Sequence, residues 1–240
     1  MHVFKKVHFF GLNFKNMFPT PLISAILLAG GKGTRFKSTI PKQFLPLGLK
    51  PLVLHSFELL AKSGLITEII IVCEDFYRHL FTSRTNLKIG FANPGVRRQD
   101  SVSSGLAQVT KGSFVCIHDA ARPFLQLEDL KEVIEQALIH KAAALAMPAK
   151  NTIKEIDSTG FVRKTLNREI LRETLTPQVI ALDLLKKGLL EAEKKKIDIT
   201  DDISAIELIG HTAKLVSGKS SNIKITSPED LQLAQSFLHA

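Results

Sequence analysis

Residues 25 to 44 read A-I-L-L-A-G-G-K-G-T-R-F-K-S-T-I-P-K-Q-F, an apolar run that stops at a glycine-rich loop. The loop and the residues after it supply three glycines and two cations: Gly30, Gly31, Gly33, Arg35 and Lys42. Glycines let backbone N–H groups approach a ligand closely, and a concave turn of such groups binds anions. The two cations can fold over a polyphosphate, so the stretch predicts a triphosphate-binding loop after a strand.

The loop differs from two familiar phosphate-binding motifs. Phe36 occupies the third glycine position of the dinucleotide fingerprint G-x-G-x-x-G. Gly218-Lys219-Ser220 supplies only the end of a Walker A loop, because Ala213 stands where its first glycine should be. What remains is similar to the A-x-G-x-G-T-R…P-K loop of nucleotidyltransferases, which attack the α-phosphate of a bound nucleoside triphosphate. A glycine-rich turn followed by solvated cations is the alternative.

Composition and charge limit the classes of partner that the chain can bind. The 240 residues suit one α/β domain, and the net charge of +9 fits a protein that handles polyanionic small molecules. The cations are dispersed, with Lys194-Lys195-Lys196 as the one triple, and no RNP or zinc-finger pattern is present, so we expect no nucleic acid. Cys73 and Cys116 lie in apolar runs without CxxC spacing, and no apolar segment approaches about 18 residues. We therefore expect a reduced, cytoplasmic protein with no membrane partner.

The first 22 residues have a separate composition. They contain five phenylalanines and three lysines but no acidic residue, without a signal-peptide apolar region or cleavage site. We expect residues 1–22 to be a poorly ordered N-terminal extension. Residues 23–240 then form the nucleotidyltransferase domain, and we expect no second catalytic domain after it.

Short apolar runs alternate with amphipathic stretches, a pattern typical of β-α units around a parallel sheet. The expected strands are Ser24–Ala29, Glu68–Val72, Lys88–Ala92, Phe114–His118, Ala142–Met147, Lys214–Ser217 and Asn222–Ile225. The expected helices are Leu52–Lys62, Gln99–Val109, Leu127–His140, Ala181–Lys195, Asp202–Ile209 and Glu229–Leu238. The fold class is therefore α/β, a mostly parallel sheet flanked by helices.

Residues 150–178 interrupt this alternation. Residues 152–156 and 161–166 read as two strands around the turn Asp157-Ser-Thr-Gly160. We predict an inserted β-hairpin arm of about residues 150–178. Such an arm is commonly a dimerisation device, and a plain surface hairpin is the alternative.

Two polar segments follow predicted strands. Gly95-Val-Arg-Arg98-Gln-Asp-Ser101 opens a helix, which places a glycine and a hydroxyl near the positive end of a helix dipole. His118-Asp119-Ala-Ala-Arg122-Pro123 puts a carboxylate where an apolar strand stops. Asp119 can ligate Mg²⁺ or accept a hydrogen bond from a sugar hydroxyl, and capping of the next turn is the alternative. His118 is interpreted as structural.

Two later segments also carry charge. Thr200-Asp201-Asp202 opens a helix, so helix capping suffices to explain it. Lys224 lies in a predicted apolar strand and needs an anion nearby or an exposed strand end.

The order of these motifs resembles the 2-C-methyl-D-erythritol 4-phosphate cytidylyltransferases of the non-mevalonate isoprenoid pathway. The resemblance runs from about residue 23 to the C-terminus. Its matching pieces are A-G-G-K-G-T-R (29–35), P-K-Q-F-L (41–45), R-Q-D-S-V (98–102), H-D-A-A-R-P (118–123), N-T-I-K (151–154), L-T-P-Q (175–178), T-D-D-I-S-A (200–205) and N-I-K-I-T (222–226). Ribitol-5-phosphate cytidylyltransferases share several of these pieces and are one alternative; a non-catalytic nucleotide-sensing domain is another.

The resemblance implies a Rossmann-like domain whose β-arm clasps a second subunit, so we expect a homodimer. It implies a reaction of CTP with a sugar-alcohol phosphate, 2-C-methyl-D-erythritol 4-phosphate, that gives 4-diphosphocytidyl-2-C-methyl-D-erythritol and pyrophosphate, with Mg²⁺ as the cofactor. The catalytic residues it implies are Arg35, Lys42, Arg168 and Lys224. The CTP-binding residues are Ala29, Gly30, Gly31, Gly33, Gly95, Arg98, Ser101, Asp119 and Ala120. The acceptor-binding residues are Asp119, Arg122, Thr152, Arg168, Thr176 and Lys224. No metal ligand is assigned, with Asp119 as the one candidate.

Overall fold

A computed structural model of the chain describes residues 22–31, 36 and 38–238. Residues 1–21, which make up nearly all of the predicted N-terminal extension, lie outside this description. Gly33 and Arg35 of the predicted triphosphate loop also lie outside it.

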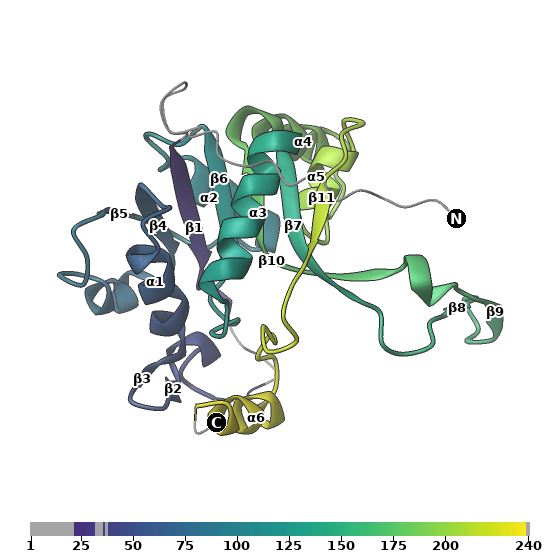
Figure 1. The fold of residues 1–240 in the computed structure, drawn as a ribbon, viewed down its shortest axis with the longest axis horizontal. Helices are drawn as coiled ribbons and strands as arrows, with labels where there is room; N and C mark the ends of the chain where they lie inside the picture. The colour runs from purple at the N-terminus through teal and green to yellow at the C-terminus, as the bar shows by residue number, and fades with distance from the viewer. Residues whose placement is uncertain (1–21, 32–35, 37, 239–240) are drawn as a thin grey trace, which may run out of the picture.

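Seven strands form one sheet in the order β11-β7-β10-β6-β1-β4-β5 (Figure 1). Neighbouring strands are parallel except around β10, which runs antiparallel to both β6 and β7. The strands are β1 (Ile23–Leu28), β4 (Glu68–Val72), β5 (Lys88–Ala92), β6 (Phe114–Asp119), β7 (Ala142–Pro148), β10 (Arg172–Ala181) and β11 (Lys214–Ser217). The predicted fold class, a mostly parallel sheet flanked by helices, is confirmed.

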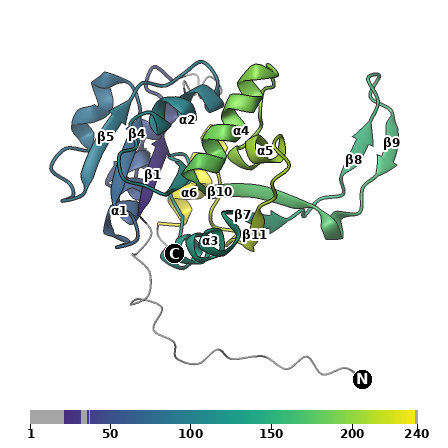
Figure 2. The ribbon, with the colours of Figure 1, turned by 90° about the horizontal axis from the view of Figure 1, so that it is seen from above.

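Helices cover both faces of the sheet because the central strands are apolar on both sides. In β1, Ala25 and Leu27 face one buried cluster and Ile26 faces the other. The first cluster includes side chains of α1 (Leu52–Lys62) and α3 (Leu127–His140). The second includes side chains of α2 (Arg98–Leu106), α4 (Leu182–Lys194) and α5 (Asp202–Glu207). Figure 2 shows α3 and α4 on opposite sides of the sheet.

One strand in the sheet differs from expectation. Residues 172–178 were expected in the arm, but they belong to β10, which inserts between β6 and β7. The pairing with β7 is irregular between Thr174 and Gln178, and Pro177 lies in this gap. Proline has no N–H for a sheet ladder and fits such an irregularity. The proline and the polar residues around it hid the strand from pattern analysis.

The predicted strand at residues 222–225 is wrong. These residues have no strand partner. The backbone N–H of Ile225 donates to the carbonyl of Ala121 at 2.8 Å, and the side chain of Ile225 is buried. An alternation of apolar residues therefore marks a buried, extended segment here rather than a sheet edge.

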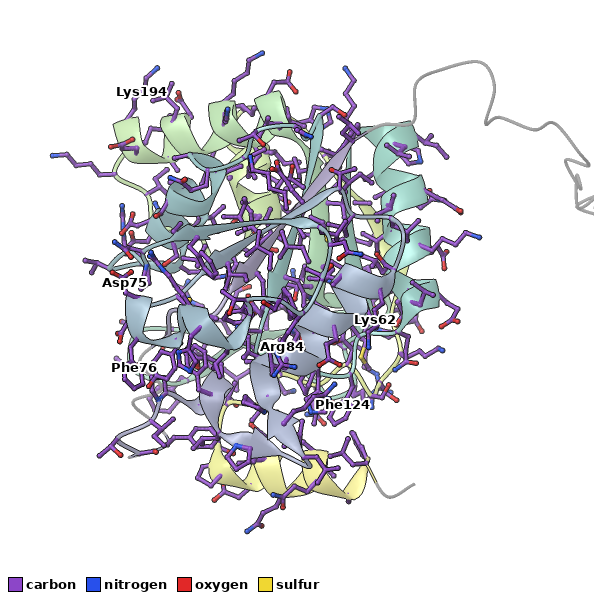
Figure 3. All side chains as sticks on the ribbon, turned by 90° about the vertical axis from the view of Figure 1, so that its left-hand side faces the viewer. Lys62, Asp75, Phe76, Arg84, Phe124 and Lys194 are labelled. Atoms are coloured by element: carbon purple, nitrogen blue, oxygen red, sulfur yellow. The ribbon has the colours of Figure 1, made fainter. Side chains whose placement is uncertain are left out.

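A small satellite core lies beneath the last helix, α6 (Pro228–Ser236). Leu47, Leu52, Ile225 and Ala234 are buried together there. Leu47 comes from the short hairpin of β2 (Pro46–Leu47) and β3 (Lys50–Pro51). Figure 3 labels Phe124 close to α6, and its ring packs edge-to-face on Phe237 at 5.3 Å between centroids. This core ties the segment after Lys42 to the segment after Lys224.

The arm comprises residues 150–171 and protrudes from the domain (Figures 1 and 2). Its hairpin consists of β8 (Lys154–Ile156) and β9 (Val162–Thr165), which pair antiparallel. Asp157 closes the turn by accepting hydrogen bonds from the backbone of Thr159 (2.9 Å) and Phe161 (3.0 Å). Gly160 has a φ of 90°, a conformation that glycine adopts without strain. The predicted hairpin is therefore present.

Two expectations about partners concern the surface. Lys194, Lys195 and Lys196 are exposed at the end of α4, as expected of a solvated helix end; Figure 3 labels Lys194 at the edge of the molecule. None of the helices in the described ranges has the length and apolar character needed to cross a bilayer.

Candidate active site

A cleft of about 790 Å³ opens at the carboxyl ends of β1 and β6. The chain runs from β1 to β4 and β5 on one side, then returns to place β6 on the other side of β1. Ligands of open α/β sheets bind at such a reversal of strand order. The cleft is lined by Leu28, Gly30, Gly31, Lys42, Gln43, Glu74, Pro94, Gly95, Val96, Arg97, Arg98, Ser101, Asp119, Ala121, Lys224 and Thr226.

The glycine loop begins where β1 ends. The backbone of Ala29 donates to the carbonyl of Val72 at 2.9 Å, so the loop leaves the sheet from a fixed point. Gly30 packs against Pro94 so closely that a Cβ at residue 30 would overlap the proline ring. A Cβ at Gly31 would meet only Gln43 Nε2, at an ordinary contact distance of 3.9 Å, and Gly31 faces the cleft. Of these two glycines, Gly30 is the one that packing requires.

Lys42 enters the cleft from a single turn of 3-10 helix, η3 (Lys42–Phe44). Phe44 anchors this turn because its buried ring stacks on Tyr77, with 3.7 Å between centroids. Its backbone N–H donates to the carbonyl of Pro41 at 2.9 Å. The turn thus buries Phe44 and leaves Lys42 on the cleft side.

The loop after β5 forms another wall. The backbone N–H of Gly95 donates to Ser101 Oγ at 3.0 Å, and a Cβ at residue 95 would overlap Asp100. Asp100 in turn accepts from the backbone N–H of Arg97 at 2.9 Å. These contacts hold the loop against the first turn of α2, where backbone N–H groups lack intrahelical partners.

Asp119 is the electrostatic centre of the cleft. Lys224 Nζ lies 2.7 Å from its Oδ2, and Arg98 Nε lies 3.4 Å from its Oδ1. Burial alone would raise the pKa of Asp119, but the positive charges of Arg98, Lys224 and Arg122 outweigh it and hold that pKa well below its usual range. Asp119 is therefore ionised at neutral pH, and it is the anion that Lys224 was expected to need.

Arg98 has a second carboxylate partner that sequence reasoning missed. Arg98 Nη1 and Nη2 donate to the two oxygens of Asp202 at 3.0 and 2.8 Å, and Asp202 is fully buried. Burial opposes the charge on Arg98, yet Asp202 and Asp119 raise its pKa above the usual value. Helix capping was expected for this segment and is provided by Asp201, which accepts from the backbone of Ser204 at 2.9 Å. The two adjacent aspartates thus have different roles, which only tertiary contacts separate.

A buried hydrogen-bond network fixes the turn after β6. His118 Nε2 contacts the carbonyl of Arg122 at 3.1 Å, so this nitrogen carries the proton. Its Nδ1 then accepts from Thr176 Oγ1 at 3.0 Å, and Thr176 Oγ1 accepts from the backbone N–H of Asp119 at 3.1 Å. Burial lowers the pKa of His118 to about 4, so the ring is neutral. His118 is structural, as its position suggested.

Arg122 is buried behind the cleft rather than in its lining. Its Nη1 donates to the carbonyl of Asn222 at 2.8 Å, which ties the turn after β6 to the segment that carries Lys224. The side chain of Asn222 donates to the carbonyl of Thr176 at 2.9 Å. Arg122 and Thr176 thus support the residues that face the cleft.

The predicted site residues fall into four groups. Eight of them line the cleft together: Gly30, Gly31, Lys42, Gly95, Arg98, Ser101, Asp119 and Lys224. Four are buried next to it: Ala29, Ala120, Arg122 and Thr176. Thr152 and Arg168 are exposed on the arm and do not line it, and Arg168 Nη1 donates to the carbonyl of Lys150 at 3.1 Å. Gly33 and Arg35 lie outside the described residues.

The side chains of the cleft offer few ligands for the expected Mg²⁺. Within the described ranges, no group of three or more His, Cys, Asp or Glu side chains could hold a metal ion. Asp119 is the only carboxylate we proposed as a ligand, and both of its oxygens face cations. Such a lining is compatible with a Mg²⁺ held mainly by substrate phosphates and water, with Asp119 as the candidate ligand from the protein.

Comparison with known proteins identifies the family. The sequence model of the 2-C-methyl-D-erythritol 4-phosphate cytidylyltransferases matches residues 23–240. A 2-C-methyl-D-erythritol 4-phosphate cytidylyltransferase of Chlamydia pneumoniae is 46% identical over 215 residues, which cover 90% of this chain and 98% of that protein. A chloroplastic enzyme of the same name from Oryza sativa subsp. japonica is 41% identical over 221 residues, which cover 90% of this chain and 74% of that protein.

A solved structure agrees with the sequence comparisons. The 4-diphosphocytidyl-2C-methyl-D-erythritol synthase of Anaerococcus prevotii superposes with a TM-score of 0.83 at 26% identity, and the match covers 92% of this chain and 100% of that one. These findings favour the erythritol enzymes over the ribitol alternative that the sequence left open. The chain belongs to the 2-C-methyl-D-erythritol 4-phosphate cytidylyltransferase family.

Proposed function

We propose that the cleft carries out the reaction of its family, in which CTP and 2-C-methyl-D-erythritol 4-phosphate give 4-diphosphocytidyl-2-C-methyl-D-erythritol and pyrophosphate. The observation that carries this proposal is the convergence of a glycine loop, Lys42 and the Arg98–Asp119–Lys224 cluster on one cleft. A phosphate oxygen of the acceptor attacks the α-phosphorus of CTP, and the bond to the β-phosphate bridging oxygen breaks. The nucleophile is already an anion, so the reaction requires no strong general base.

The barrier in such a reaction comes from repulsion between anions and from charge on the α-phosphoryl oxygens. Preorganised positive groups lower this barrier most. We assign Lys42, together with Arg35, to the charge that develops on the α-phosphate. The glycine loop and the loop with Gly95 and Ser101 are assigned to CTP, whose polar edges can pair with their backbone groups.

Asp119 organises the acceptor side of the cleft in this proposal. Its ionised carboxylate holds Lys224 in place at 2.7 Å and can accept a hydrogen bond from a sugar hydroxyl. Lys224, whose side chain is partly exposed, then presents its charge to the acceptor phosphate. Arg122 and Thr176 support this arrangement from behind, which revises their expected direct contact with the acceptor to a supporting one.

Mg²⁺ completes the proposed site. It would be held by the phosphates of CTP, with Asp119 as its one candidate ligand from the protein. When bound, it supplies neutralisation of the phosphate charges. Lys42 and Lys224 supply charge at fixed positions, and the glycine loop orients the triphosphate.

The arm supports the further proposal of a homodimer. It carries exposed apolar side chains at Ile156, Phe161, Val162 and Ile170, which a partner subunit can bury. Thr152 and Arg168 do not line the cleft of their own chain. We therefore assign both to the acceptor side of the partner's cleft, where Arg168 binds the acceptor phosphate as a bidentate clamp.

A cytoplasmic, reducing location is part of the proposal as well. Burial raises the pKa of the Cys73 thiol to about 11 and that of Cys116 to about 12. Both thiols are buried and free, so neither takes part in a disulfide. This pattern is typical of proteins from reducing compartments.

A pyrophosphate-release assay tests the proposed function. CTP should support turnover with 2-C-methyl-D-erythritol 4-phosphate, and ribitol 5-phosphate should be at least about 100-fold poorer, since a site built on hydrogen bonds rejects mismatched partners. UTP in place of CTP measures base selection in the same way. Binding of CTP without any pyrophosphate release would instead support the nucleotide-sensing alternative.

A further inference from the structure

Gln43 contacts the glycine loop in a way that the proposed roles do not use. Its side chain is almost fully buried, next to Lys42 on η3. Its Nε2 donates to the carbonyl of Ala29 and to the carbonyl of Gly31, both at 2.7 Å. One amide therefore clamps both ends of the first part of the loop.

This clamp determines which way the loop presents its backbone. A trans peptide unit points its C=O and the following N–H in opposite directions. Because the carbonyl of Ala29 points to Gln43, the N–H of Gly30 points away from it. In the described part of the chain, the N–H groups of Gly30 and Gly31 have no hydrogen-bond acceptor, and both glycines line the cleft. Such groups suit an anion.

The side-chain amide of Gln43 is only half satisfied at this position. Gln43 Oε1 is buried and has no hydrogen-bond partner among the described residues. Leaving a buried acceptor unpaired costs about 1–3 kcal/mol. A methionine would fill the same space without that unpaired oxygen, but it could not hold the two carbonyls.

We propose that Gln43 is a positioning residue for the triphosphate. It keeps the carbonyl dipoles of Ala29 and Gly31 out of the cleft, so that the loop presents N–H groups to the phosphates of CTP. The inference rests on the proposed function, and it concerns a residue that acts through the loop rather than on the substrate.

The first test is Gln43→Met, measured by steady-state kinetics, CTP titration and thermal unfolding. We expect kcat to fall about 10- to 100-fold, because a misplaced binding loop loses alignment of the reacting groups. The Kd for CTP should rise several-fold, and the KM for the acceptor should stay within about two-fold. Tm should fall as it does in the control, because both variants lose two hydrogen bonds of a buried glutamine. The matched control is Gln99→Met. Gln99 is a buried glutamine that donates to Ile197 O at 3.2 Å and accepts from Ile199 N at 2.9 Å, so its loss should lower Tm and leave kcat nearly unchanged.

The second test, Gln43→Glu, separates positioning from filling of space. A buried carboxylate that faces two carbonyls should have a raised pKa. Its protonated form can donate one hydrogen bond to the loop, whereas its ionised form can donate none and repels both carbonyls. The turnover of Gln43→Glu relative to wild type should therefore rise at least about five-fold as the pH falls from 8.5 to 6. This test applies even if Gln43→Met does not fold.

Two results would overturn the proposal. One is a Gln43→Met enzyme with kcat within about three-fold of wild type; the other is a Gln43→Glu ratio that does not change with pH. Lys42→Ala serves as the reference for the proposed function itself. If Lys42→Ala is also as active as wild type, the assignment of the cleft fails; if only the Gln43 variants are unaffected, the clamp fails and the cleft stands.

Discussion

The cleft and the arm carry predicted site residues in opposite ways. In the cleft, charged groups contact one another: Asp119 lies between Arg98 and Lys224, and Arg98 also binds the buried Asp202. On the arm, Thr152 and Arg168 are exposed, and the described contact of the Arg168 side chain is with a backbone carbonyl of the same arm. The cleft is preorganised within one chain, whereas Thr152 and Arg168 lie outside the lining of that cleft.

The difference has a physical reason. A buried charge must be paired, so the cleft residues depend on one another, and changing one leaves another uncompensated. An exposed arginine is solvated and needs no partner for stability. Substitutions in the cleft should therefore affect both the chemistry and its support, while substitutions on the arm should affect only what the arm reaches.

The largest expected effect is at the cleft. Lys42→Ala should lower kcat by about 100- to 1,000-fold, because it removes one preorganised charge from the developing phosphoryl anion. Initial rates of pyrophosphate release measure this, with CTP affinity measured separately by titration. Turnover within a few-fold of wild type would show that Lys42 has no part in the reaction, and the contrast between cleft and arm would lose its basis.

The next effect is at the arm. Arg168→Ala should lower acceptor turnover by about 10- to 100-fold, since charged hydrogen bonds to a phosphate contribute about 1.5–3 kcal/mol. CTP affinity and Tm should stay close to wild type, because Arg168 is exposed and outside the cleft. The neighbouring exposed Lys164→Ala is a matched control that removes a cation from the same arm.

Mixed dimers decide whose cleft Arg168 serves. If the arm reaches the partner, co-expressed Arg168→Ala and Lys42→Ala subunits should regain up to about a quarter of wild-type activity, because one cleft of each mixed dimer has both residues. Differently tagged subunits confirm that mixed dimers form. No recovery in confirmed mixed dimers would mean that both residues serve their own chain.

The smallest effect on turnover is expected at the amino end of β4, where a buried carboxylate lies outside the lining of the cleft. Glu68 begins β4 and is fully buried. Its Oε1 accepts from Ser24 Oγ at 2.7 Å and from the backbone N–H of Thr110 at 2.9 Å, and its Oε2 accepts from Thr110 Oγ1 at 2.7 Å. Burial alone would raise the pKa of Glu68, but these hydrogen bonds lower it to about 2.

The lowered pKa makes Glu68 a source of acid-sensitive stability. Its contribution is fully present above the ordinary glutamate pKa of about 4.5 and is lost as the pH falls from there toward 2. Glu68→Gln should reduce the free energy of unfolding by about 2 kcal/mol at pH 7 and by less at pH 3. Denaturant unfolding at both pH values measures this, and kcat should not change. The exposed Glu132→Gln on α3 is the control; an equal loss in both variants, or a loss that does not depend on pH, would contradict this account.

Much of the fold could be predicted because local pattern and tertiary role agree. The bounds of α3, β4, β5 and β11 match their predicted residues. β10 could not be predicted because Pro177 and its polar neighbours conceal a strand that only its neighbours β6 and β7 define. The opposite error occurred at residues 222–225, where a strand was predicted and none is present. Ile225 is apolar because it is buried in the satellite core, where it has no strand partner.

The site shows the same division. Glycines and charged residues that follow predicted strands are visible in the sequence, and Gly30, Lys42 and Asp119 do line the cleft. Residues that act through others are not visible in this way: Asp202 looks like a capping residue until Arg98 is seen 2.8 Å away. Gln43 belongs to the P-K-Q-F-L motif (41–45), but its contacts with the loop carbonyls depend on how η3 packs. The sequence offered one signal for Asp202: a single aspartate, Asp201, is enough to cap the helix, so a second one beside it needs another explanation.

The ion pair between Asp119 and Lys224 joins residues that are 105 positions apart in the chain. A ribosome adds about 5–20 residues per second, so Lys224 is synthesised about 5 to 20 seconds after Asp119. During that interval the strands from β1 to β6 can already pair, while Asp119 has Arg98 and Arg122 as nearby cations but lacks Lys224. The nascent enzyme thus acquires its nucleotide loop early and its acceptor cation last, so a prematurely terminated chain would be expected to retain phosphate-binding surface without catalytic competence.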